Sequence, residues 1–225
     1  HLKRKAIYGV KKDKVVIVTG GRGLYGASIS EGLCEMGAIV IVASRNGEKC
    51  EEYAKTLRDK GYKAYGMSLD LSDDASIKKL TDDVAERFGR IDVLVNNAVD
   101  RRNMTPLSTA TRELLQSSAD TNLTGTIILS KYVIEKMLKQ GKGSIINISS
   151  IRGLDCPHFP LYPDTFGDQS VNYTTEKWAM EGLTKYMAGR YGKNNIRVNS
   201  IAPGGFNPGM GDDPDKKALV DAYIE

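Results

Sequence analysis

Three residues in the second half of the chain have side chains that could move a proton together. Tyr173 and Lys177 are four positions apart, and a pair at this spacing shares one face of a helix. A lysine ammonium would then lie beside a phenol, which is a poor base at neutral pH because its ordinary pKa is about 10. A nearby positive charge favours the phenolate. The pair therefore predicts an acid/base group, and Ser150, at the end of an apolar run, is expected to face it while Ser149 points away.

A second candidate for chemistry lies near the N-terminus, where Thr19 to Gly26 reads T-G-G-R-G-L-Y-G. Glycine permits a positive φ and lets the backbone come close to a pyrophosphate, whose charge is stabilised at the N-terminus of a following helix. Taken alone, these glycines would equally suit a tight structural turn. Their position directly after the first apolar run favours a dinucleotide site.

The elements that would position these residues alternate along the whole chain. Short runs rich in apolar residues predict strands at 14–19, 39–43, 63–68, 91–95, 144–148 and 197–201. Between them, amphipathic patterns predict helices that end near 36 or cover 47–60, 73–88, 111–139 and 173–191. This alternation predicts an α/β fold, a Rossmann-type doubly wound parallel sheet in three αβα layers. We expect one domain over residues 1–225, in which residues 1–12 form a basic N-terminal extension.

Composition argues against several classes of protein. The sequence lacks the run of about 18 apolar residues that a membrane-spanning helix needs. It also lacks the basic face interleaved with aromatic residues that is typical of nucleic-acid binding. The three cysteines have no C-x-x-C spacing, which predicts reduced thiols and no metal site. We therefore expect a cytoplasmic protein whose partner is a small molecule.

Several motifs, in order and covering nearly the whole sequence, resemble the short-chain dehydrogenase/reductase family. They are the glycine turn, Asp70-Leu71, Asn96-Asn97-Ala98, Asn122, Ser150, Tyr173-x-x-x-Lys177 and Pro203-Gly204. The resemblance implies hydride transfer between a nicotinamide and an alcohol/carbonyl pair, in a protein that forms a homotetramer or homodimer.

The resemblance also implies the roles of single residues. The catalytic tetrad would be Asn122, Ser150, Tyr173 and Lys177. Ser150 would hydrogen-bond the substrate oxygen, Tyr173 would move the proton, Lys177 would hold the ribose, and Asn122 would anchor a water in the proton relay. Besides Tyr173 and Lys177, the cofactor-binding residues would be Gly20, Arg22, Gly23, Leu24, Tyr25, Gly26, Ser44, Arg45, Asp70, Leu71, Asn97, Ala98, Pro203 and Gly204.

The chain departs from the family pattern at four places. The middle glycine of the turn falls one residue early, Val99 replaces the usual glycine after Ala98, the segment between Ser150 and Tyr173 is long, and Pro208 stands where a threonine is usual. None of these changes removes a tetrad residue. Together they resemble members associated with modification of sugars and surface polysaccharides. Family members also usually continue through a final helix and strand, which we expect beyond Glu225.

The end of the second predicted strand reads Ser44-Arg45-Asn46. NAD enzymes place an acid there to hold the ribose 2′-hydroxyl, whereas Arg45 and Arg22 can pair with a 2′-phosphate. The sequence therefore favours NADP(H) over NAD(H). Two solvated arginines beside an NAD site are the alternative.

Cationic or hydrogen-bonding residues also follow the fourth and fifth predicted strands. They are Arg101, Arg102, Arg152 and His158, and they favour a sugar, sugar acid or polyol as substrate, with residues 154–171 as a candidate lid. A ketoreductase of acyl or steroid-like carbonyls, and a non-catalytic nucleotide-binding member of the family, remain as alternatives.

Overall fold

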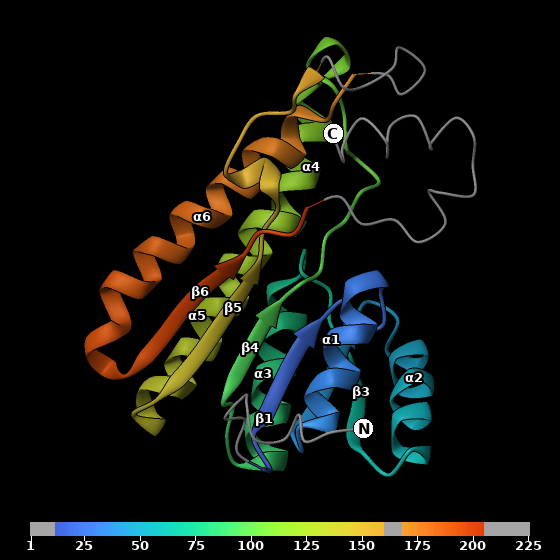
Figure 1. Cartoon of the computed structure of the whole chain (residues 1–225), viewed down its shortest axis with the longest axis vertical. Helices are drawn as coiled ribbons and strands as arrows, with labels where there is room; N and C mark the ends of the chain where they lie inside the picture. Colours follow the sequence, from blue (N-terminus) through green and yellow to red (C-terminus); the bar gives the residue numbers. More distant parts are fainter. Residues whose placement is uncertain (1–11, 160–167, 205–225) are drawn as a thin grey trace.

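The computed structural model describes residues 12–159 and 168–204, and in these residues the six predicted strands form one parallel sheet (Figure 1). The strands are β1 (Val15–Thr19), β2 (Ile39–Ser44), β3 (Lys63–Ser68), β4 (Val93–Asn96), β5 (Gly143–Ile148) and β6 (Ile196–Ile201). Their order across the sheet is β3-β2-β1-β4-β5-β6, and every neighbouring pair is parallel. The predicted Rossmann-type fold is confirmed.

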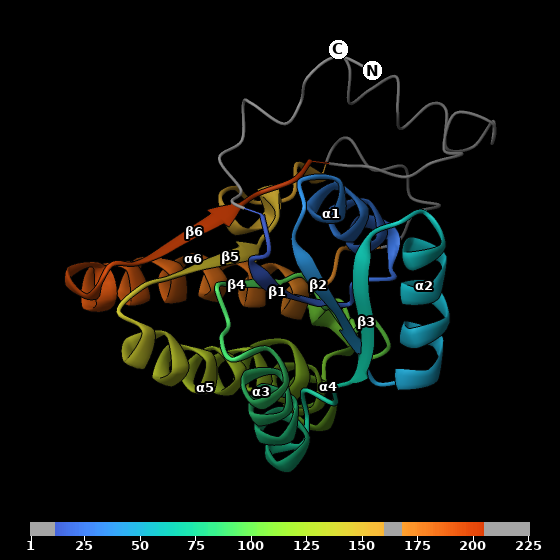
Figure 2. The same ribbon diagram turned by 90° about the horizontal axis from the view of Figure 1, so that it is seen from below.

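Helices cover both faces of this sheet (Figure 2). On one side are α1 (Leu24–Glu35) and α2 (Gly47–Asp59), and on the other are α3 (Asp74–Phe88), α5 (Gly125–Gln140) and α6 (Val171–Tyr191). Strand β1 supplies both cores, because side chains alternate along a strand. Val15 and Ile17 belong to the core that includes residues of α3, α5 and α6, whereas Val16 and Val18 belong to the core that includes residues of α1 and α2.

The helix predicted over 111–139 is interrupted. It consists of α4 (Arg112–Ala119), a π-helical turn at Asp120–Thr124, and α5. A π turn holds one residue more than an α turn and often marks a functional position. Gly125, directly after it, is packed so closely that a Cβ would lie 1.9 Å from the carbonyl oxygen of Leu71.

The carboxyl ends of the strands define the edge where a site is expected. Strand order reverses between β1 and β4, and open sheets of this kind bind ligands in the crevice outside such a reversal. The segments after β1, β2, β4 and β5, which carry most of the predicted site residues, all leave the sheet at this edge. No helix within the described residues has both the length and the apolar content needed to cross a membrane.

Candidate active site

The start of α6 brings Tyr173 and Lys177 together. Ser170 caps this helix by accepting a hydrogen bond from the backbone amide of Tyr173 at 3.3 Å. Lys177, only 8% exposed, donates from Nζ to the carbonyl oxygen of Ile148 at 2.8 Å. Its Nζ lies 5.6 Å from the centroid of the Tyr173 ring. The phenol therefore has an amine beside it that is anchored to the end of β5.

Burial dominates the electrostatics of this amine. Desolvation by burial, helped by the positive charge of Arg101, lowers the pKa of Lys177 to about 8. Glu176 and Glu181 act in the opposite direction. A lysine with this pKa is poised near neutral pH, as expected for a group that takes part in proton transfer.

The two serines after β5 face different ways. Ser150 caps a short 3₁₀ helix, Ile151–Gly153, with its Oγ accepting from the amide of Arg152 at 3.2 Å. This arrangement uses an acceptor site of the hydroxyl and leaves its hydrogen to be donated. Ser149 instead donates from Oγ to the carbonyl of Lys177 at 3.4 Å and is 3% exposed. Ser150 is therefore the serine suited to donate to a substrate oxygen.

Asn122 lies in the π turn and is fully engaged by the protein. Its Oδ1 accepts from the amide of Asp100 at 2.7 Å. Its Nδ2 donates to the carbonyl of Asp100 at 3.0 Å and to Oε2 of Glu176 at 2.9 Å. Both amide hydrogens have partners, so a relay water could donate to this side chain but would not receive a proton from it.

The glycine turn between β1 and α1 has the shape that a pyrophosphate needs. Gly20 has a φ of 62°, and a Cβ on Gly26 would lie 2.0 Å from the carbonyl oxygen of Gly20. Helix α1 begins after Gly23 without a side-chain cap and with no acidic residue in its first turn. First-turn amides have no acceptor within a helix and attract anions, so this loop fits a dinucleotide.

Residues after β4 hold the loop in place. Thr19 Oγ1 accepts from the amides of Asn97 and Ala98 at 3.0 and 2.9 Å. Asn97 Nδ2 donates to the carbonyls of Thr19 and Gly20 at 2.9 and 3.2 Å. The predicted cofactor residues Asn97 and Ala98 thus stabilise the start of the glycine turn by hydrogen bonds to Thr19 and Gly20. Thr19, which is not among the predicted site residues, ties the glycine turn to the segment after β4 through these hydrogen bonds.

The remaining predicted cofactor residues lie at or after the carboxyl ends of β1, β2, β3 and β6. Arg22 and Leu24 are exposed within the glycine turn. Tyr25 donates a hydrogen bond from its hydroxyl to the carbonyl oxygen of Gly204 at 3.5 Å. The carbonyl oxygen of Pro203 accepts from the amide of Ile151 at 3.0 Å. Ser44 contacts Cys50, with 2.9 Å between Oγ and Sγ, and hydrogen bonds from Ser72 lower the pKa of Asp70. Leu71 differs, because its side chain lies in the core and only its backbone could reach a ligand.

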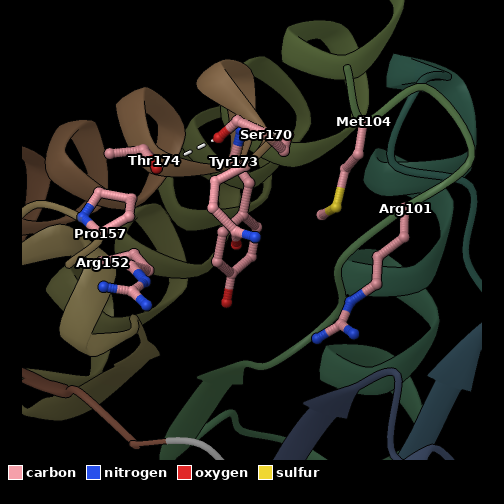
Figure 3. Close-up of a pocket in the computed structure, with 8 residues that line it drawn as sticks. Arg101, Met104, Arg152, Pro157, Ser170, Tyr173 and Thr174 are labelled. Atoms are coloured by element: carbon pink, nitrogen blue, oxygen red, sulfur yellow. Dashed lines mark hydrogen bonds between the residues drawn. The ribbon is translucent and has the colours of Figure 1, made fainter. Parts of the chain in front are cut away.

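A cavity of about 210 Å³ opens beside the phenol. Its lining comprises Arg101, Met104, Arg152, Pro157, Gln169, Ser170, Tyr173 and Thr174. Figure 3 shows the Tyr173 hydroxyl pointing between the two arginines, and the guanidinium carbon of Arg101 lies 6.0 Å from the ring centroid. A substrate here would meet a proton donor and two cations.

Two of the predicted substrate residues are not among those that line this cavity. Arg102 forms a bidentate hydrogen-bonded pair with Asp100, at 3.0 and 2.9 Å from its Nε to the two carboxylate oxygens, and does not line the cavity. His158 is exposed and is not among the lining residues, although its neighbour Pro157 is. The candidate lid over 154–171 falls partly outside the described residues. Among the described residues, no three or more His, Cys, Asp or Glu side chains come together in a group that could hold a metal ion.

The sequence analysis did not assign a buried acid that is adjacent to Lys177 on α6. Glu176 accepts from Ser118 Oγ at 2.6 Å and from Asn122, and it is 7% exposed. A signal for it existed in the sequence, because position 176 is three residues after Tyr173 and so shares its helix face.

Comparisons with known proteins agree with this geometry. A family model described as short chain dehydrogenase matches residues 14–218. The 7alpha-hydroxysteroid dehydrogenase of Bacteroides fragilis is 32% identical over 195 residues, covering 86% of this chain and 71% of that protein.

Two solved structures extend the comparison. An NAD⁺-bound xylitol dehydrogenase gives a TM-score of 0.79 at 30% identity, over 88% of this chain and 73% of that one. A gluconate 5-dehydrogenase from Burkholderia cenocepacia, in complex with NADP and tartrate, gives 0.80 at 26% identity, over 95% and 88%. The chain therefore belongs to the short-chain dehydrogenase/reductase family and is an NAD(P)-dependent oxidoreductase that acts on CH–OH groups.

Proposed function

We propose that this enzyme interconverts an alcohol and a carbonyl on a sugar, sugar acid or polyol, with NADP(H) as the preferred cofactor. The single observation that carries the substrate class is the pair of arginines, Arg101 and Arg152, that line the same cavity as Tyr173, while the cofactor preference rests on Arg45 after β2. Guanidinium groups bind carboxylates in bidentate fashion. The names of the xylitol and gluconate relatives support the same substrate class.

The side chains divide the work around the substrate oxygen. When bound, the nicotinamide supplies or accepts the hydride at the substrate carbon. In the reducing direction, Ser150 donates a hydrogen bond to the carbonyl oxygen and Tyr173 gives it the proton. In the oxidising direction, the phenolate of Tyr173 takes the proton from the alcohol, and the nearby ammonium of Lys177 stabilises that phenolate.

A second candidate is reduction of a steroid-like or acyl carbonyl. The steroid dehydrogenase relative supports it, as do the apolar side chains of Met104 and Pro157 in the cavity lining. The non-catalytic alternative that the sequence left open does not stand, because the chain is an NAD(P)-dependent oxidoreductase. The cytoplasmic location and the homo-oligomer expected from the sequence stay predictions.

A substrate panel tests the proposal. Turnover of xylitol, gluconate, their keto forms, a hydroxysteroid and an acyl ketone should be followed by nicotinamide absorbance with both cofactors. Arg101→Ala and Arg152→Ala should each raise KM for gluconate by about tenfold or more, because each removes a charged hydrogen-bond donor, and should change KM for xylitol far less. Arg112→Ala, an exposed arginine at the start of α4, is the control. Turnover of the steroid or acyl carbonyl alone, unaffected by these variants, would support the second candidate instead.

A further inference from the structure

Arg45 and Asp100 form an ion pair between the segments that follow β2 and β4. Arg45 directly follows β2 and Asp100 comes four residues after β4, and these two strands lie on either side of β1. The Nη1 of Arg45 is 3.2 Å from Oδ2 of Asp100. The pair therefore meets over the carboxyl end of β1, where the glycine turn begins.

The two partners differ in burial and in how the protein holds them. The Asp100 backbone is held on both sides by the Asn122 amide, and Asn122 is held by Glu176. The Asp100 side chain is 10% exposed, whereas the Arg45 side chain is 49% exposed. A ligand that needs this guanidinium must therefore draw Arg45 away from a fixed carboxylate.

Two further charged residues, Arg102 and Asp70, interact with the Arg45–Asp100 pair. Asp100 also holds Arg102, and this hydrogen-bonded arginine lowers the pKa of Asp100 to about 2, so the acid is ionised at neutral pH. Asp70 is close enough for both arginines to act on it. Two cations and two anions, from the segments after β2, β3 and β4, thus interact with one another. The residue after β2, here Arg45, is where family members recognise the ribose 2′ position.

We propose that Asp100 is a specificity-determining residue for the cofactor, because its carboxylate competes with a 2′-phosphate for Arg45. The loop after β4 here supplies the acid that the end of β2 lacks. The inference rests on the proposed preference for NADP(H), which the sequence attributes to Arg45, and it adds that Asp100 limits this preference.

Dissociation constants for NADPH and NADH, from titrations of nicotinamide fluorescence, test the proposal without any substrate. Asp100→Asn keeps the size of the side chain and removes its charge. It should shift the NADPH-to-NADH affinity ratio towards NADPH by about fivefold, the upper range for one exposed ion pair. Asp59→Asn provides a matched control, since Asp59 also pairs with a basic residue, Lys55, at the far end of α2, and it should leave the ratio unchanged.

A double variant tests whether Asp100 acts on cofactor binding through Arg45. In an Arg45→Ala background, Asp100→Asn should shift the ratio by less than about twofold, because the contested guanidinium is gone. An equal shift in both backgrounds, or no shift in either, overturns the inference while leaving the proposed function intact. If the unmodified enzyme binds neither dinucleotide, both fail. Asp100→Ser serves the same purpose if the Asn variant does not fold.

Discussion

Tyr173 is flanked by two cationic side chains, those of Lys177 and Arg101. Its role predicts that Tyr173→Phe lowers kcat by at least about 10²-fold, the low end for a general acid/base, while the dissociation constant for NADPH stays the same. Turnover by absorbance and binding by fluorescence check the two halves separately. Tyr186→Phe, an exposed tyrosine on the same helix, should have no effect. Retained turnover in Tyr173→Phe would refute the assignment.

Lys177 predicts a stability difference that depends on pH. Burial lowers its pKa from 10.5 to about 8 in the folded protein, so the folded state binds this proton less well than the unfolded chain. The wild type should therefore lose stability relative to Lys177→Met as the pH falls from 10.5 to 8. The change should approach about 3 kcal/mol and then level off below pH 8.

Urea unfolding of both proteins at pH 10, 9 and 8 measures this difference. Lys185→Met on the exposed side of α6 is the control, because its charge is not buried and its effect should not vary over this range. A difference between wild type and Lys177→Met that is constant with pH would contradict the prediction.

At the scale of elements, the start of α1 should tolerate no side chain at Gly26. A Cβ there would lie 2.0 Å from the carbonyl oxygen of Gly20, and the backbone cannot yield without moving the loop. Gly26→Ala should cost about 1–3 kcal/mol in the free energy of unfolding and should weaken NADPH binding.

The same helix offers a matched control. A Cβ on Gly32 would meet no atom within 4 Å, so Gly32→Ala should stabilise the helix by roughly 0.5–1 kcal/mol and leave cofactor binding unchanged. Denaturant unfolding and fluorescence titration measure both variants. Equal effects of the two substitutions would show that the loop is not as tightly packed as described.

The π turn at Asp120–Thr124 separates α4 from α5, where the sequence predicted one continuous helix. The apolar pattern over 111–139 is continuous enough to predict one helix, and nothing local marks the extra residue of the turn. The turn is stabilised by contacts far away in sequence, namely those of Asn122 with Asp100 and Glu176. The apolar pattern of a helix indicates which face is buried. It does not indicate where the backbone hydrogen bonds change from the α-helical to the π-helical spacing.

At the scale of the whole molecule, two cores lie on opposite faces of one sheet. Leu129 on α5 belongs to one core and Leu57 on α2 to the other, and both side chains are at most 1% exposed. Because β1 contributes to both cores, we expect them to unfold together. Leu129→Ala and Leu57→Ala should each lower the free energy of unfolding by about 2–5 kcal/mol and shift one common transition.

Circular dichroism and fluorescence, followed in the same urea titration, measure this transition. Leu138→Ala, at a position that is 41% exposed on α5, should cost much less. Two separate transitions, each sensitive to only one core substitution, would contradict the expected single domain.

The sequence by itself determined the fold class and the order of its elements. Apolar runs such as 39–43 and 144–148 are buried on both faces of the sheet, and this burial is what makes a parallel strand recognisable in a sequence. It also determined the spacing of Tyr173 and Lys177, since the geometry of a helix converts four positions into one shared face. These features depend on neighbours along the chain.

Only the tertiary structure decided which charges meet. Arg101 and Arg102 are adjacent in sequence, yet one lines the cavity with Tyr173 and the other pairs with Asp100. Likewise, Arg45 has no acid beside it in the sequence but meets Asp100 across β1. Ion pairs form between side chains that the order of strands brings together, and that order is fixed by the packing of the whole sheet and not by local sequence.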